Sequence, residues 1–153
     1  MLKWTWVSIL VFFIDQLTKW VAEANLEEHV PYPVFNHLNM MLAYNYGAAF
    51  SSFSGFRWWL AGLSIIVSLF ILYWINKLKE NETWTAIGLA LVLGGAIGNL
   101  ADRLLNGKVI DFIDVYWTEA GYHFATFNVA DIAISTGAAL LVVISLFDKQ
   151  KNQ

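Results

Sequence analysis

The chain has 153 residues, of which 58% are hydrophobic and only 14% are charged, and its mean hydropathy is +0.54. This length suits one domain, and the charge content lies far below the roughly 25% of soluble domains, so the composition predicts a membrane protein. The formal net charge is −3 with no basic run, which argues against nucleic acid as a partner. The absence of cysteine excludes disulfides, thiolate nucleophiles and cysteine-ligated metals.

Four apolar stretches follow one another along the chain. Each is about 18–22 residues long, which is enough to cross a hydrocarbon core of ~30 Å as a helix. We therefore expect one membrane-embedded domain over residues 1–153, a mainly α fold with four transmembrane helices. The expected helices are at about 4–22, 58–75, 84–105 and 127–147, and the expected connections are at about 23–57 and 106–126.

The first stretch begins behind Lys3 and could be mistaken for a signal peptide, because Ala22-Glu23-Ala24 imitates a cleavage site. Polar residues 15, 16, 18 and 19 interrupt its apolar core, however, which favours a retained helix. Asp15 and Lys19 are four residues apart and so share one helical face. Because charges facing lipid are costly, this pair is expected to face protein or the membrane interface.

The connection at 23–57 is polar at first and too long to be a simple turn. Its later part is rich in β-compatible residues and reaches a turn signal at Asn45-Tyr46-Gly47. In the next long connection, residues Val109 to Trp117 alternate as a strand does, and Glu119-Ala120-Gly121 suits a turn. The sequence therefore predicts a small extramembrane β element that pairs this strand with the 34–50 region.

The basic residues predict the orientation. One membrane side is flanked by Lys3, Lys77, Lys79, Lys149 and Lys151. By the positive-inside rule, both termini are expected in the cytoplasm. The costly polar groups of the spans and of the outer connections then gather at the outer membrane surface, which indicates a common site there. These groups are Asp15, Lys19, Asn45, Asn99, Asp102, Arg103, Asp111, Asn128 and Asp131.

Asp111 and Asp131 are the favoured catalytic pair. Two neighbouring carboxylates cannot both ionise at low cost, so one holds a proton and acts as an acid while the other activates water. The alternative is that each caps a helix or pairs with a base, and Asp131 is placed to accept from amides in the first turn of the fourth helix.

The other polar candidates have simpler structural interpretations. Asp102 adjoins Arg103, so an ion pair would account for both. Asp114 lies three residues from Asp111, and this odd spacing turns it to the opposite face of a strand. Asn99 and Asn128 either orient the carboxylates or hydrogen-bond other helices.

Two further chemistries are weaker. Ser51, Ser52 and Ser54 with Lys19 would resemble a serine–lysine hydrolase, but a serine-rich loop explains them as well. The three histidines at 29, 37 and 123 show no metal-ligand spacing, so no metal is expected.

Outside enzymes, a small proton-coupled transporter would also need intramembrane charges, but spread across the membrane depth. A purely structural protein would leave the cost of the carboxylates unexplained.

Five short blocks together resemble one known family. They are DQLTK at 15–19, NYGAAF at 45–50, GGAIGNLADR at 94–103, VIDFID at 109–114 and FNVAD at 127–131. In this order, within four spans, they are similar to the signature blocks of bacterial lipoprotein signal peptidase, or signal peptidase II. The resemblance covers nearly the whole chain.

This resemblance implies an intramembrane aspartic endopeptidase of the bacterial inner membrane. Such an enzyme removes the signal peptide of a diacylglyceryl-modified prolipoprotein just before the lipidated cysteine. It implies Asp111 and Asp131 as the catalytic dyad and an extramembrane β-cradle, here on the periplasmic side. We expect the enzyme to need no cofactor and to be a monomer whose partners are its substrate and membrane lipid. The supporting positions that the resemblance implies are Asn45, Asn99, Asp102, Arg103, Asn128, Asp15 and Lys19.

The orientation gives a first prediction. A topology reporter fused after Lys79 should report a cytoplasmic location, and reporters near Glu27 and Glu119 should report a periplasmic one, because basic flanks stay in the cytoplasm. Alkaline phosphatase and fluorescent-protein fusions measure this. A periplasmic signal after Lys79 would overturn the orientation.

Overall fold

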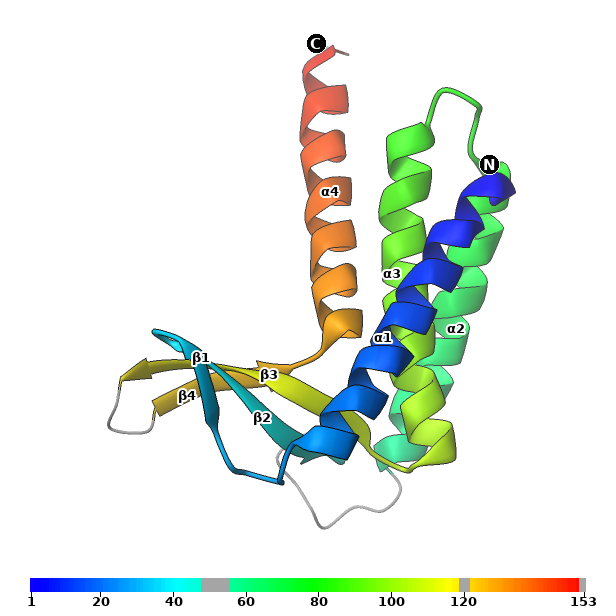
Figure 1. Ribbon diagram of the computed structural model, residues 1–153. Helices are drawn as coiled ribbons and strands as arrows, with labels where there is room; N and C mark the ends of the chain where they lie inside the picture. The colour runs from blue at the N-terminus through cyan, green and yellow to red at the C-terminus, as the bar shows by residue number, and fades with distance from the viewer. Residues whose placement is uncertain (48–55, 119–121, 152–153) are drawn as a thin grey trace.

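The computed structural model describes residues 1–47, 56–118 and 122–151. It contains four long helices standing side by side and one four-stranded antiparallel sheet across one end of them (Figure 1). All four helices are long and apolar enough to span a membrane. The predicted class, a mainly α membrane protein with a small β element outside the spans, is confirmed.

The helices differ slightly from the expected ranges. They are α1 at Thr5–Asn25, α2 at Phe56–Lys77, α3 at Thr83–Leu105 and α4 at Val129–Lys151, and a 3₁₀ turn at Leu2–Trp4 precedes α1. Helix α4 begins two residues later than expected because Phe127 ends a strand and Asn128 caps the helix. At the opposite end of the helices from the sheet lie the N-terminus and the C-terminal end of α4 (Figure 1).

The sheet has the order β1-β2-β3-β4. Its strands are β1 at Tyr32–Phe35, β2 at Leu38–Asn45, β3 at Val109–Thr118 and β4 at Tyr122–Phe127. The predicted pairing of β3 with the 34–50 region is confirmed, since β2 and β3 are antiparallel partners, and a bulge lies in β2 between Met40 and Ala43. This register places Asn45 beside Val109 and Ala43 beside Asp111, so the catalytic candidate of β3 lies near the end of β2.

The turn predicted at Asn45-Tyr46-Gly47 is present. The Asn45 side-chain Oδ1 accepts from the backbone N of Gly47 at 2.9 Å, and Gly47 has a positive φ of 90°. The turn predicted at Glu119-Ala120-Gly121 and the serines 51, 52 and 54 lie outside the described residues.

Helix α3 is the centre of the bundle and contacts each of the other three helices. Two faces of α3 carry glycines where another backbone comes close. An added Cβ at Gly94 would lie 2.8 Å from the Ser8 carbonyl oxygen of α1, and one at Gly95 would collide with the Ala130 carbonyl of α4. The absence of side chains at these positions therefore lets α1 and α4 pack on α3.

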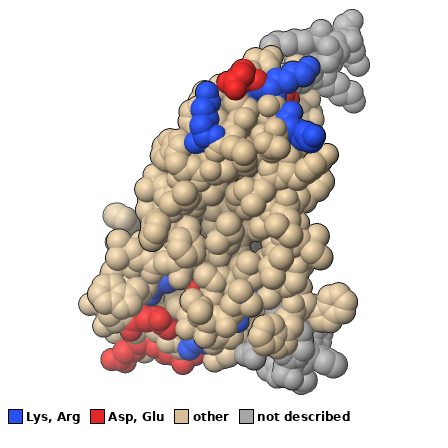
Figure 2. All heavy atoms as spheres, turned by 90° about the vertical axis from the view of Figure 1, so that its right-hand side faces the viewer, with Lys and Arg blue, Asp and Glu red and all other residues tan. Residues whose placement is uncertain are grey.

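The charges are sorted to the two ends of the molecule. On the face shown in Figure 2, most lysine and arginine side chains lie at the end away from the sheet, acidic ones are most numerous at the sheet end, and the belt between them carries almost no charged side chains. At the end away from the sheet, Lys3 Nζ lies 3.5 Å from Glu80 Oε2. This arrangement suits a protein whose middle lies in lipid.

The packing of α1 on α3 gives a second prediction. Gly94→Ala should destabilise the protein, because the new methyl group would force α1 away from α3, and overpacking typically costs about 1–3 kcal/mol. Gly62→Ala is the matched control, since no atom lies within 4 Å of a Cβ there. Thermal unfolding in detergent measures both, and equal melting temperatures would contradict the assigned contact.

Candidate active site

A buried ammonium group lies at the sheet end of the bundle. Lys19 of α1 is 1% exposed, and its Nζ lies 2.8 Å from Asp15 Oδ2 and 2.8 Å from Asp102 Oδ2. The same Nζ donates to Asn99 Oδ1 at 2.9 Å. The predicted pairing of Asp15 with Lys19 inside the protein is thus confirmed, and α1 and α3 are joined by paired charges.

The two carboxylates that hold Lys19 also bind backbone amides of other elements. Asp15 Oδ1 accepts from the backbone N of Ala130 at 2.8 Å, in the first turn of α4. Asp102 Oδ2 accepts from the backbone N of Ile110 at 3.2 Å, in β3. The cluster therefore fixes the beginnings of both elements that carry the catalytic candidates.

The sequence did not single out Gln16, which completes this cluster. Its Nε2 donates to Asp102 Oδ1 at 3.0 Å and to the Gly98 carbonyl at 3.3 Å. The sequence offers only one hint of this role, the place of Gln16 between the charged residues of DQLTK. That hint is weak, because adjacent residues of a helix are not expected to share a face.

Asn99 and Asn128 connect the cluster to the two candidate carboxylates. Asn128 Nδ2 donates to Asp111 Oδ1 at 2.7 Å and to Asn99 Oδ1 at 3.1 Å. Asn99 Nδ2 donates to Asp131 Oδ1 at 2.8 Å. The structure thus brings Asn99, Asn128, Asp111 and Asp131 into one hydrogen-bonded network, with side chains from α3, β3 and α4.

Asp111 is almost fully buried, at 2% exposure. Besides Asn128, its carboxylate is bonded by Asn45, whose Nδ2 lies 3.3 Å from Oδ2. Burial, and next the negative charge of Asp131, raise the pKa of Asp111 from 3.8 to about 6. This carboxyl group therefore carries a proton at a pH where an exposed aspartate is ionised.

Asp131 is half-buried and makes the cap contacts that the alternative interpretation expected. Its backbone N donates to Asn128 Oδ1 at 3.0 Å, and its Oδ2 accepts from the Asn128 backbone N at 3.3 Å. This reciprocal pair is a capping box at the start of α4. The cap holds Asp131 beside Asn99, so the capping and catalytic interpretations are compatible.

The ion pair expected between Asp102 and Arg103 is not the one found. Among the described residues, the ion pair of Asp102 is with Lys19, and Arg103 Nη1 donates to the Asn99 carbonyl at 3.3 Å. Adjacent helical residues point in directions about 100° apart, which separates the two side chains. Arg103 lies close enough for its charge to act on Asp131, Asp102 and Asp111.

Asp114 makes a different contact, with a residue of β2. It is fully buried, and its Oδ2 accepts from Asn39 Nδ2 of β2 at 3.0 Å. Its cross-strand partner is Asn39, whereas that of Asp111 is Ala43. Asn39 could not be identified as a partner from the sequence, because cross-strand partners depend on register.

Two of the three histidines have side chains that the structure describes. His29 is exposed, and His37 stacks near the Tyr116 and Trp117 rings. Within residues 1–47, 56–118 and 122–151, no group of three histidine, aspartate or glutamate side chains could hold a metal ion.

Comparisons with known proteins agree on one family. A family model described as signal peptidase (SPase) II matches residues 7–147. The lipoprotein signal peptidase of Teredinibacter turnerae is 49% identical over 95% of this chain and 88% of its own length. The lipoprotein signal peptidase of Pseudomonas aeruginosa strain UCBPP-PA14 is 46% identical, over 99% of this chain and 91% of its own. This chain belongs to the signal peptidase II family.

Solved structures agree with this assignment. A bacterial membrane enzyme solved by the in meso method at 2.3 Å resolution superposes with a TM-score of 0.85 and 29% identity, covering 99% of this chain and 92% of that one. A second, at 1.9 Å resolution, gives a TM-score of 0.84 and 30% identity, covering 94% and 92%. This signal peptidase II is a membrane protease that cleaves the signal peptides of lipoproteins.

The buried carboxyl group gives a third prediction. Between pH about 4 and about 6, Asp111 keeps its proton in the folded peptidase while the unfolded chain has lost it. Stability should therefore fall as the pH rises through this interval. An asparagine at this position cannot ionise, so the stability of the Asp111→Asn variant should lack this part of the pH dependence. Relative to the wild type, the variant should therefore become more stable above about pH 6.

Melting temperatures in detergent across this pH range measure the effect. Parallel curves for the wild type and Asp111→Asn would show that Asp111 does not titrate in this interval.

Proposed function

We propose that Asp111 and Asp131 are the catalytic dyad of this peptidase. One observation supports this most strongly: two amides that bond each other connect the carboxylates of β3 and α4. Asn128 Nδ2 donates to Asp111 and to Asn99, and Asn99 Nδ2 donates to Asp131. The charge of Asp131 contributes to the raised pKa of Asp111, as expected for carboxylates that titrate as a pair. The guanidinium of Arg103 also lies close enough for its charge to act on both carboxylates.

The proposed reaction is direct attack of water on the scissile carbonyl. One carboxylate removes a proton from the water while the carboxyl group of the other protonates the leaving amine. A group with a pKa near 6 suits this exchange at neutral pH, because it gives up and regains a proton with little driving force.

The supporting residues fall into groups according to what each of them contacts. Asn45, Asn99 and Asn128 donate to the dyad and hold its oxygens in place. Asp15, Lys19 and Asp102 hold the elements that carry it. Arg103, half-buried beside the dyad, is proposed to bind polar groups of the substrate.

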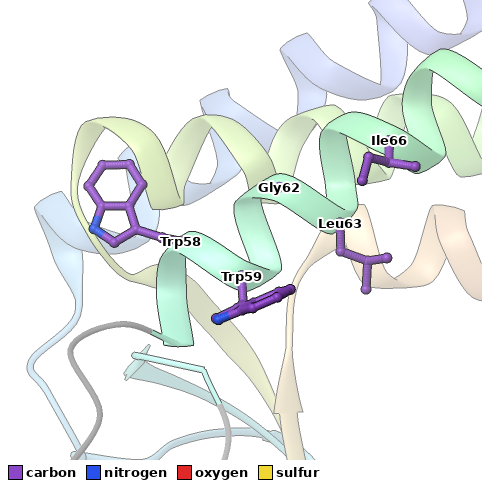
Figure 3. Close-up of a pocket in the computed structure, with 5 residues that line it drawn as sticks. All are labelled: Trp58, Trp59, Gly62, Leu63 and Ile66. Atoms are coloured by element: carbon purple, nitrogen blue, oxygen red, sulfur yellow. The ribbon is translucent and has the colours of Figure 1, made fainter.

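The substrate is proposed to be the diacylglyceryl-modified form of the prolipoprotein. An apolar cavity of about 420 Å³ lies along the beginning of α2, lined by Trp58, Trp59, Gly62, Leu63 and Ile66. Figure 3 shows the Trp59, Leu63 and Ile66 side chains along one stretch of the helix, a surface suited to hydrocarbon chains.

The whole chain is proposed to act as one domain and as a monomer in the bacterial inner membrane. The lysines at the end away from the sheet support cytoplasmic termini (Figure 2). The dyad would then lie near the periplasmic surface, where water enters and the lipidated substrate arrives by diffusion in the membrane.

A fourth prediction tests the dyad. Asp111→Asn and Asp131→Asn should each abolish turnover without unfolding the protein, because each swap keeps the size and removes the exchangeable proton. The double variant should be no worse than either single one, since groups that act as a unit fail together. Single-turnover cleavage of lipidated precursor in nanodiscs measures this.

Asp114→Asn, on the same strand but bonded to Asn39, is the matched control and should lose far less activity. Ser51→Ala, Ser52→Ala and Ser54→Ala should leave cleavage largely intact. An active Asp111→Asn variant, or an inactive serine variant that is folded, would refute the dyad.

A fifth prediction concerns the lipid. A precursor without its diacylglyceryl group should be cleaved at a much lower kcat/KM, because the acyl chains supply both membrane depth and buried apolar area. Purified precursors with and without the modification provide the comparison. Equal rates would show that the peptidase does not bind the lipid.

A further inference from the structure

The ammonium of Lys19 is hydrogen-bonded to saturation. A lysine has three N–H donors and no acceptor. The three are matched by Asp15 Oδ2, Asp102 Oδ2 and Asn99 Oδ1, at 2.8, 2.8 and 2.9 Å. The two carboxylates already more than offset its single positive charge, so charge balance does not require the third partner, a neutral amide.

This third contact decides which way the Asn99 amide points. An asparagine amide has an acceptor end and a donor end, and its partners select between two orientations. Asn99 Oδ1 faces two donors, Lys19 Nζ and Asn128 Nδ2. Turned by 180°, the amide would set N–H groups against both donors and its oxygen against the Asp131 carboxylate.

We propose that Lys19 is a positioning residue of the peptidase reaction, because its ammonium fixes the Asn99 amide so that Nδ2 always donates to Asp131. This inference rests on the proposed role of Asp131 in the dyad. Without Lys19, the turned orientation would be opposed by the Asp131 carboxylate and the Asn128 amide but no longer by a charged donor on Oδ1, and the Asn128 amide is shared with Asp111 and the Ile110 carbonyl. Asp131 would then lose its donor for part of the time, and turnover would fall while substrate binding would not.

A purely structural role for Lys19 makes a different prediction. Lys19 would then act only by joining Asp15 and Asp102, and its removal would impair the enzyme equally with or without Asn99. A double-mutant cycle separates the two roles, because residues that act through one contact are not additive. Removing one member of a buried ion pair often destabilises by about 3–5 kcal/mol, so the cycle needs a background with less buried charge.

We would therefore build the cycle on Asp102→Asn, adding Lys19→Met, Asn99→Ala and both. Every Lys19→Met step then makes the same change in charge, so its general electrostatic effect on the dyad cancels. With Asn99 present, Lys19→Met should lower kcat about tenfold or more and change KM less than about twofold. With Asn99→Ala, the same change should lower kcat less than about twofold.

An equal loss of kcat in the two arms would overturn the inference. Should the background be too slow to measure, amide NMR of asparagine-labelled protein decides the question on the full chain in detergent. The Asn99 side-chain resonance, assigned by its loss in Asn99→Ala, should shift or broaden in Lys19→Met, and an unchanged resonance would also overturn the inference.

The same assay separates this inference from the proposed function. Active Asp111→Asn or Asp131→Asn variants would refute the dyad itself. Inactive dyad variants together with an additive cycle would refute only the positioning role of Lys19.

Discussion

The contact on which this structure depends is the buried ion cluster of Lys19 with Asp15 and Asp102. Taking charged groups out of water costs several kcal/mol for each ion, and only close pairing with further hydrogen bonds offsets that cost. Here the pairing is met by residues of α1 and α3, and the carboxylates extend it to the amides of Ala130 in α4 and Ile110 in β3. Separating α1 from α3 would therefore leave a charge unpaired, and losing α4 or β3 would remove an amide hydrogen bond from the cluster. The elements β3 and α4 carry the proposed dyad.

The same constraint explains why the polar chemistry sits at one end of an otherwise lipid-compatible protein. The helices pack through apolar side chains such as Ile75 and Leu93 and through glycines on α3, which need no polar partner. Near the sheet, strands and helix ends supply the backbone N–H donors that buried carboxylates require. The buried carboxylates can thus lie at the end of a lipid-compatible helical bundle with hydrogen-bond donors beside them.

The sequence predicted much of this architecture. The spans follow from hydropathy, β3 from alternation, and the Asp15–Lys19 pair from a spacing of four, because each is a local pattern. The partner of Asp102, the role of Gln16 and the Asn39–Asp114 contact were missed, because they depend on how separate elements meet. Asp111 and Asp131 were proposed as a pair from carboxylate chemistry and from the family resemblance, and only the structure showed that Asn99 and Asn128 connect them.

The central claim is that this network activates water directly, with no covalent intermediate on the enzyme. Cleavage of lipidated precursor in the presence of hydroxylamine tests it, because hydroxylamine intercepts an acyl-enzyme as a hydroxamate. The signal peptide should be released only as the free carboxylate, whatever the hydroxylamine concentration. A signal peptide hydroxamate whose yield rises with hydroxylamine would contradict the aspartyl mechanism.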